Sequence, residues 1–532
     1  MKFNFFDKAF LKKKFRTLKA YKIILKNNKI ERIDKIKEKL IDTKIVCNNE
    51  KINSFFFGDL KINLDLSLRQ FVYSRLIYYK INECLCRSLA FDDKIIFPLP
   101  LPWIRVLEKE NLNVSIIGCS LLWFLFIAKF FLIAQFFSLK TIFNFFFKKK
   151  FHKKNSIYFF DFPYGNLQNK TKFINLIKIF KKKFGHESTN IFYHDDSKLP
   201  DFLKLSDNLS LIKNKNFIRI SSLGNFLLFI LLWPFYSFLT LVLIFYNYSY
   251  LILLKELLLS KIFTLENTNQ SSVYFFSNSS SLYRPLWTYF IELSGSKYYY
   301  YFYSLSCPPI KEVNFLNKEE FNKYFRSNYF GLKYISWDKF LFTTKFQMEF
   351  YVDTLVNKKI SYQIDNLFFD TGRNCKINTS KKILGVFDVS PFRFSYCAYR
   401  NAPLMTQHKQ TQNFYTDIIA LKNKFDLHLI FKIKRADKSL IISKNYINYL
   451  KNLQNEKNVT VLAEDYSVES VIDRCDAIIS FPFTTAGFIG KLLNKNSAFY
   501  DLSPCKYRLP LAYNKVLIIK DFDALNNWIA KI

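Results

Sequence analysis

A long apolar stretch at residues 226–254 carries no charged side chain and is the feature that most constrains how this chain can fold. Its length is sufficient to cross a hydrocarbon core of about 30 Å. A second apolar stretch at residues 114–147 has Lys129 and Lys140 as its charged residues, and three lysines follow it at 148–150. The chain must therefore either place two apolar helices at a membrane or bury both in a protein core.

The segment between the two stretches argues against two membrane spans. If both crossed, residues 148–219 would lie opposite both flanks, yet this segment holds 16 Lys and Arg against 6 Asp and Glu. The positive-inside bias opposes its export. It also reads as part of an α/β unit, with strands at 156–161 and 190–194. We therefore expect a hydrophobic hairpin lying in or re-entering the membrane; two buried core helices of a soluble protein are the alternative.

The formal net charge of +36, from 79 Lys and Arg against 43 Asp and Glu, has more than one source. The excess of Phe, Lys, Asn, Ile and Tyr is the pattern that an AT-rich genome produces through codon choice. The remaining charge favours attraction to an anionic membrane or to phosphate-bearing substrates, with nucleic acid as the third candidate. Because half of the residues are apolar, a disordered polyelectrolyte is excluded.

Strands alternate with helices along most of the chain. The first 110 residues read as helical and basic, and strands dominate the pattern from residue 272 onward. They are expected at 272–277, 298–303, 382–388, 427–432, 459–462, 477–480, 497–500 and 516–519. Residues 308–380 read as a linker that contains an aromatic-rich helix at 337–355. The alternation predicts a parallel, doubly wound sheet, whose ligands bind beyond the carboxyl ends of the strands.

The sharpest local signal lies at residues 475–487. A buried strand ends at Ser480, a turn containing Pro482 follows, and Thr484 and Thr485 stand at the start of a helix. Hydroxyls and free backbone N–H groups at a helix N-terminus form a site for phosphate oxygens. The alternative is that Thr484 is simply the N-cap. Because the turn lies at the carboxyl end of a strand, we favour phosphate binding.

Charged residues follow the strands that neighbour this turn. Lys432, Lys434 and Arg435 end one of them and would neutralise a diphosphate, unless they are a solvated charge run. Asp388 and Arg393 follow the strand before it. Arg393 is a further candidate for the phosphates, and Asp388 is a candidate for a sugar or ribose hydroxyl.

A third strand is followed by Glu464, which either contacts a nucleotide base or ribose or is an ordinary solvated carboxylate. Several motifs are missing from the sequence. It contains neither the G-x-G-x-x-G fingerprint after a strand nor a P-loop, and its Cys and His residues lack zinc-site spacing. We therefore predict no catalytic metal.

The residues around these sites resemble a known family. The run D-A-I-I-S-F-P-F-T-T at 476–485 resembles the signature of bacterial polysaccharide-biosynthesis proteins of the PFTS-motif family, with Thr485 in place of its Ser. Further matches are Y-R-P-L-W-T-Y at 283–289, V-F-D-V-S-P-F-R at 386–393, K-I-K-R at 432–435, and Tyr500 with Asp501. The apolar stretches and F-P-L-P-L-P-W at 97–103 also fit this family.

The resemblance implies a GT-B-like arrangement, in which two Rossmann-like domains face a cleft and the C-terminal one holds a nucleotide-activated donor. The strand–Ser–turn–Thr–helix unit is also similar to the donor site of teichoic-acid-type glycerophosphotransferases and bacterial sialyltransferases. The cations at 432–435 and the helix at Thr484 would stabilise the donor diphosphate without a metal or other cofactor. A general base would come from the N-terminal domain, with Asp161 or else Glu292 as candidates. Each of these two is alternatively an ordinary surface or capping carboxylate.

The predicted organisation is a helical basic region at 1–110, an N-terminal Rossmann-like domain at 111–380 and a donor-binding domain at 381–532. The predicted function is sugar transfer from a nucleotide-activated donor to a lipid-linked or glycan acceptor at the cytoplasmic face of the bacterial inner membrane. Alternatives are polyol-phosphate transfer, nucleotide-sugar epimerisation on the same fold, and a non-catalytic membrane scaffold of polysaccharide assembly. Nucleic acid is not an expected partner, because the sequence has no recognisable binding module.

Overall fold

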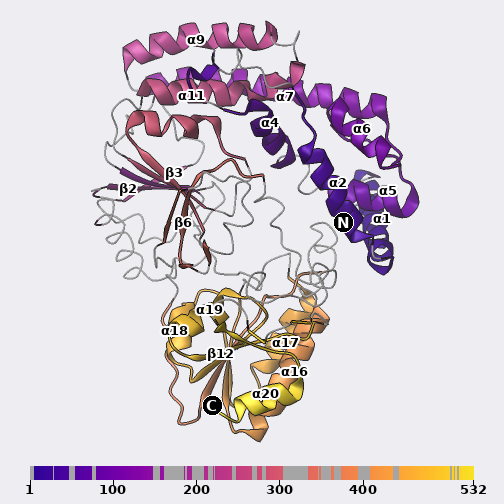
Figure 1. Cartoon of the computed structure of the whole chain (residues 1–532), viewed down its shortest axis with the longest axis vertical. Coiled ribbons are helices and arrows are strands. Elements are labelled where there is room, and N and C mark those ends of the chain that lie inside the picture. The colour runs from indigo at the N-terminus through magenta and orange to yellow at the C-terminus, as the bar shows by residue number, and fades with distance from the viewer. Residues whose placement is uncertain are drawn as a thin grey trace.

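The structure is a computed structural model of the chain. It describes residues 5–27, 29–46, 54, 56–60, 62–74, 80–147, 156–160, 182, 185, 188–193, 209–213, 220, 222–242, 247–266, 272–277, 283–302, 334–345, 347–348, 361–364, 373–393, 408–434, 442–503, 506–507, 510–511 and 515–532. Figure 1 shows apolar helices at one end of the long axis, a parallel sheet beneath them, and a second sheet with its own helices at the other end.

The N-terminal region is helical, as predicted. Its helices include α1 (Phe5–Lys26), α2 (Ile30–Asp42), α4 (Leu64–Val72), α5 (Asn82–Phe91) and α6 (Leu101–Lys109). Helix α1 packs on α5, and α2 packs on α6. These helices flank the apolar end of the molecule (Figure 1).

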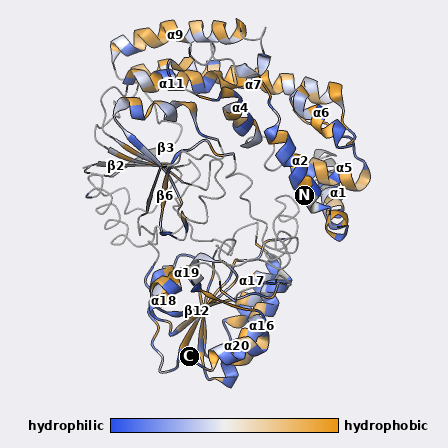
Figure 2. Ribbon diagram, in the orientation of Figure 1, coloured by the Kyte–Doolittle hydropathy of each residue, from blue (hydrophilic) through white to orange (hydrophobic). Residues whose placement is uncertain are grey.

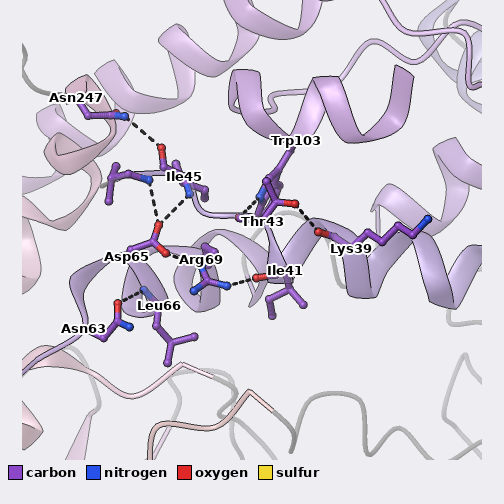
Figure 3. Close-up of polar contacts among 11 residues, drawn as sticks. Lys39, Ile41, Thr43, Ile45, Asn63, Asp65, Leu66, Arg69, Trp103 and Asn247 are labelled. Carbon is purple, nitrogen blue, oxygen red and sulfur yellow. Dashed lines mark hydrogen bonds and ion pairs between the residues drawn. The ribbon is translucent and has the colours of Figure 1, made fainter. Parts of the chain in front are cut away.

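A buried ion pair within α4 organises this region (Figure 3). Asp65 accepts hydrogen bonds from Arg69 Nε at 2.8 Å and from the backbone N–H groups of Ile45 and Val46 at 2.9 and 3.0 Å. Further bonds join Arg69 to the carbonyl of Ile41, Trp103 of α6 to that of Thr43, and Asn247 to that of Ile45. The loop after α2 is thereby tied to α6 and to the helices over the sheet.

Two apolar helices, α7 (Ile116–Phe147) and α9 (Leu223–Val242), lie at that end, with α9 outermost (Figure 1). Both pack on the 3-10 helix η5 (Tyr248–Leu253) and on helix α11 (Leu254–Glu266). The charge-free stretch is therefore divided. Its first part belongs to an exposed helix, and its second part, in η5, is almost entirely buried.

Side-chain contacts show that α7 and α9 run antiparallel. The rings of Phe145 and Phe226 stack with centroids 4.0 Å apart. Further along both helices, Trp233 Nε1 donates to Gln135 Oε1 at 2.7 Å, and Gln135 Nε2 donates to Ser237 Oγ at 3.1 Å. These three polar side chains are thus paired between the helices, and the exposed positions of both helices are mostly apolar, with Lys129 as an exposed charge on α7.

A seven-stranded parallel sheet lies below this layer, in the order β3-β2-β1-β4-β5-β6-β7. Its strands are β1 (Ser156–Phe160), β2 (Ser188–Tyr193), β3 (Leu209–Lys213), β4 (Val273–Ser277), β5 (Lys297–Tyr301), β6 (Lys339–Phe342) and β7 (Ser361–Ile364). The 3-10 helices η6 (Leu286–Phe290) and η7 (Glu292–Ser294) lie between β4 and β5. Strands β1 and β4 are neighbours although α9 and α11 separate them in sequence.

Aromatic pairs set the register of the central strands in this sheet. Tyr158 stacks on Tyr274, and Phe159 on Phe275, with centroids 4.8 and 4.9 Å apart, and both pairs are direct partners in the β1–β4 ladder. Cross-strand pairs of this kind stabilise a sheet. Much of the aromatic excess of the sequence is therefore core material.

The second sheet has six parallel strands in the order β10-β9-β8-β11-β12-β13. They are β8 (Ile383–Phe387), β9 (His428–Lys432), β10 (Val459–Leu462), β11 (Ala477–Ser480), β12 (Asn496–Tyr500) and β13 (Leu517–Ile519). Its helices are α16 (His408–Lys424), α17 (Lys444–Leu453), α18 (Val468–Asp473), α19 (Thr485–Leu492) and α20 (Phe522–Ile529). Helices α18 and α19 cover one face, and α16, α17 and α20 cover the other (Figure 1).

The predicted fold class is confirmed. Both sheets follow the Rossmann strand order 3-2-1-4-5-6, and the first sheet adds a seventh strand. In this order the direction in which strands are added to the sheet reverses between the first and fourth strands. The two Rossmann-like units stand in tandem, a GT-B-like organisation, with a helical N-terminal region and inserted apolar helices.

The expected helix at 337–355 and the linker at 308–380 are wrong in part, because β6 and β7 both lie there. In β6, Phe340, Leu341 and Phe342 are all buried. A strand covered on both faces reads as a continuous apolar run, which cannot be told from a buried helix by periodicity.

Candidate functional site

The strand order of the second sheet reverses between the parallel neighbours β8 and β11. The candidate residues gather where these two strands end. Phe387, the last residue of β8, is paired with Ser480, the last residue of β11. The N–H of Phe481 then donates to the Phe387 carbonyl at 2.8 Å. The loop that begins with Asp388 and the P-F-T-T turn therefore start side by side, at the position where doubly wound sheets bind ligands.

The turn itself is tightly wound. Phe483 has a φ of 56°, in the left-handed region that aromatic side chains rarely occupy. The N–H of Thr484 donates back to the carbonyl of Phe481 at 3.3 Å. Strained non-glycine residues of this kind cost about 1–3 kcal/mol and cluster at functional sites.

Two hydroxyls in the turn are buried without a hydrogen-bond partner among the described residues. Ser480 Oγ and Thr484 Oγ1 both belong to side chains with little or no exposure, 0% and 5%. Thr484 is the N-cap residue of α19, but its side chain makes no capping hydrogen bond. Thr484 therefore occupies the N-cap position, but its hydroxyl does not cap the helix.

Gly487, in the first turn of α19, allows the helix to approach these hydroxyls. A Cβ at this position would lie 2.7 Å from Ser480 Oγ and 2.3 Å from Cε1 of Phe499 on β12. Neither distance is compatible with a side chain. The glycine thus lets the N-terminus of α19 sit against the ends of β11 and β12.

Asp388 is buried, and its carboxylate is surrounded by donors from the protein. Oδ1 accepts from the N–H and the hydroxyl of Ser390 at 2.9 and 3.4 Å, and Oδ2 accepts from the hydroxyls of Tyr415 and Tyr446. Burial and the nearby carboxylate raise the pKa of both tyrosines well above the usual range, so both remain donors. The carboxylate fixes the loop after β8, in which Ser390 has a φ of 49°.

The predicted cations lie on two adjacent loops. Lys432 is buried, and its ammonium group donates to the carbonyls of Ile433 and Glu464, both at 3.2 Å. Lys434 is exposed. Its backbone N–H donates to Ser390 Oγ at 3.2 Å, and this bond joins the loops after β8 and β9.

The remaining candidates of this sheet are less central. Arg393 is half-buried, and its Nε donates to the Ile442 carbonyl at 2.7 Å. Glu464 follows β10, where its carbonyl serves as a partner of Lys432. Arg435 lies outside the described residues. The geometry therefore groups Ser480, Thr484 and the Asp388 loop, with Lys434 beside them.

A second carboxylate cluster, to which the sequence analysis gave no role, flanks the turn on its other side. Asp501 follows β12 and accepts from Lys520 Nζ at 2.8 Å, the Tyr507 hydroxyl at 2.7 Å and both donors of Ser503 at 2.9 and 3.0 Å. The Tyr507 ring contacts that of Phe483 in the turn. The Asp501 cluster thus supports the turn.

A sequence signal for this cluster was present. The run D-V-S-P at 388–391 recurs as D-L-S-P at 501–504, each directly after a buried strand. In both copies the serine N–H donates to the aspartate at 2.9 Å. Two turns with the same aspartate–serine hydrogen bond therefore stand on either side of β11, at the ends of its neighbours β8 and β12.

Of the two candidates for the general base in the first sheet, the structure describes only Glu292. Glu292 belongs to η7 directly before β5, and it forms an ion pair with Lys339 at the start of β6. It therefore lies at the amino edge of the parallel strands, opposite the edge at which such sheets bind ligands. Asp161 lies outside the described residues.

Comparison with known families decides the affiliation. The sequence pattern described as "Polysaccharide biosynthesis PFTS motif protein" matches residues 238–529, more than half of the chain. The chain belongs to this PFTS-motif family. The match spans β4 to β7 and the whole second sheet, including the turn at 481–485. The resemblance that the motifs indicated is thereby confirmed.

Solved structures with a similar overall path share little sequence with this PFTS-motif protein. A proposed UDP-N-acetylglucosamine 2-epimerase from Listeria monocytogenes has 7% identity and a TM-score of 0.37, covering 72% of this chain and 88% of its own. The wall teichoic acid polymerase TagF has 11% identity and a TM-score of 0.36, covering 76% of this chain and 86% of its own. The protein OtsA has 10% identity and a TM-score of 0.35, covering 71% of this chain and 91% of its own. No curated protein matches the chain significantly.

Proposed function

We propose that this PFTS-motif protein is a glycosyltransferase of bacterial surface polysaccharide biosynthesis. It takes a sugar from a nucleotide-activated donor and transfers it to a membrane-linked glycan acceptor. One observation carries the proposal: the buried hydroxyls of Ser480 and Thr484, at the N-terminus of α19, have no hydrogen-bond partner in the part of the chain that the structure describes. Buried polar groups are nearly always hydrogen-bonded, so this pair fits an anionic oxygen that arrives with a substrate.

The donor diphosphate is the group that this site suits. The dipole of α19 favours negative charge at its first turn. Lys434 and Arg393, on the loops after β9 and β8, add positive charge on the same edge of the sheet, and Arg435 is assigned the same task. As the glycosidic bond to the diphosphate breaks, charge develops on the phosphate oxygens. Preorganised donors that stabilise this charge lower the barrier without a metal.

The other assignments are supporting ones. Lys432 and Asp388 hold the loops. Thr485, the first residue of α19, is assigned to the donor phosphates, and Glu464 to the nucleoside part of the donor. The base that deprotonates the acceptor hydroxyl is assigned to Asp161, since Glu292 lies at the amino edge. The acceptor is proposed to be lipid-linked and the protein to work at the cytoplasmic face of the inner membrane, because a polysaccharide-biosynthesis protein here carries two exposed apolar helices.

Donor binding is tested by thermal-shift measurements on the full chain in detergent, with UDP-, GDP- and CMP-sugars and CDP-polyols. We expect a shift with one nucleotide class, lost in Thr484→Val and kept in Thr416→Val, which changes an exposed threonine on α16. A folded protein that shifts with none of these donors refutes donor binding.

The same screen separates the alternatives on this fold. A response confined to CDP-polyols indicates polyol-phosphate transfer. Conversion of a nucleotide sugar without acceptor indicates epimerisation. A scaffold predicts that cells carrying Thr484→Val and Lys434→Ala keep their surface glycan, a result that would refute catalysis at this site.

A further inference from the structure

Helices α7 and α9 consist mostly of hydrophobic residues (Figure 2), and many of their large apolar side chains are exposed. Inside the protein, only 17% of the apolar stretch of α7 and 22% of that of α9 are buried. Phe136 is 70% exposed, Leu231 is 69% exposed and Phe238 is 66% exposed. The alternative that both are core helices is therefore wrong. An apolar face of this extent marks an interaction surface.

The first sheet shows that α9 does not cross a membrane. Strands β1 to β3 precede α9 and β4 follows it, yet β1 pairs directly with β4 in one sheet. The segments before and after α9 therefore lie on the same side. Strands β1 to β3 lie between α7 and α9 in the sequence. If both helices crossed the membrane, these strands would be separated from β4, and the pairing of β1 with β4 excludes this.

The N-terminal region lies on that side as well. Gln70 of α4, which precedes α7, donates to the carbonyl of Tyr334, and Ser336 Oγ donates back to Gln70 Oε1 at 3.2 Å. Tyr334 and Ser336 stand just before β6 of the first sheet. Helix α4 before the two apolar helices, strands β1 to β3 between them and strands β4 to β6 after them consequently lie on one side.

The charge around these helices identifies the occupant. Residues 111–160 and 208–255 contain no Asp or Glu, and all their charged residues are Lys or Arg. An apolar face whose own helices and adjoining sequence carry only cationic charges is complementary to a leaflet with anionic lipids. It is not complementary to itself, because two copies face to face would bring like charges together.

We propose that the α7–α9 face inserts into a single leaflet of an anionic membrane, with both helices lying along it and the whole remaining chain on one side. At 1.5 Å per residue, α7 is about 48 Å long, which exceeds the hydrocarbon thickness of about 30 Å and suits a flat orientation. This mode of binding rests on the proposed membrane location but not on the transfer activity.

The test uses the full chain and sealed vesicles without any donor, so its outcome is independent of catalysis. Vesicles of phosphatidylcholine with phosphatidylglycerol should float the wild type, and vesicles of phosphatidylcholine alone should float much less. The combined change Phe136→Lys and Leu231→Lys should reduce flotation at least tenfold. The matched control Leu293→Lys, on η7, alters a side chain that is also 69% exposed but lies outside the face.

Topology is read by an impermeant thiol reagent added outside the vesicles. Cysteines introduced as Glu108→Cys before α7, Lys182→Cys between the helices and Lys297→Cys after α9 should all react without permeabilisation. Protection of any one of them would show a crossing and overturn the proposal. Unchanged flotation of the double variant would also overturn it, as would a vesicle-free dimer that the same variant dissociates.

Discussion

Two buried hydroxyls, those of Ser480 and Thr484, have no partner among the described residues. Replacing them should stabilise the nucleotide-free protein while weakening its binding of donor. The variants are Ser480→Ala and Thr484→Val, which nearly preserve side-chain shape. A buried polar group without a partner costs about 1–3 kcal/mol, so each variant should raise the free energy of unfolding by up to that amount. For a unit of this size, each kcal/mol corresponds to a rise in Tm of about 2–4 °C.

The same hydroxyls should matter in the opposite direction once the donor is bound. A hydrogen bond to a charged oxygen is worth about 1.5–3 kcal/mol, which corresponds to a loss of affinity of about 10- to 150-fold in each variant. The assays are denaturant unfolding of the free protein and titration with the donor found in the thermal-shift screen. A structural role for the hydroxyls would produce no gain in stability.

Ser497→Ala is the matched control. Ser497 is also buried beside α19, but its hydroxyl donates to the Gly487 carbonyl at 2.8 Å. Its removal should lower the free energy of unfolding by about 1 kcal/mol. If Ser480→Ala and Thr484→Val lower stability as Ser497→Ala does, and donor affinity is unchanged, the reasoning from unpartnered hydroxyls is refuted.

Three further outcomes are expected. Gly487→Ala should destabilise the chain by about 1–3 kcal/mol because its Cβ would collide with Phe499, whereas Gly224→Ala, on α9 with open space around it, should not; equal unfolding midpoints would contradict this. Burial, and then the charge of Lys381, lowers the pKa of His428 below 6.5. The stability that this group contributes is present above that pH and is lost on acidification, so His428→Gln should flatten the acid limb of the unfolding midpoint; an unaltered limb would show that other groups set it. Chelation of divalent metals should leave the transfer rate unchanged, and a rate that falls with EDTA and returns with Mg²⁺ would contradict a metal-independent mechanism.

The alternation of apolar strands and amphipathic helices was enough to predict the second sheet, because each of its strands is short and bounded by turn residues. The run at 339–342 was misread because a strand buried on both faces has no alternation. The role of Asp388 was out of reach of sequence reasoning: spacing shows that it follows a strand, but not that Tyr415 and Tyr446, on two different helices, donate to its carboxylate. The edge on which Glu292 lies depended equally on tertiary placement.

The position of α7 in the chain also has a consequence for synthesis. Its inner face packs on α11, which begins more than 100 residues after α7 ends. At about 5–20 residues per second, the ribosome needs about 5–20 s to supply that cover. Strand β1 waits equally long for β4. A nascent chain with a long bare apolar helix is prone to aggregate, so capture of α7 by the bilayer during translation would protect the first half of the protein before its own core exists.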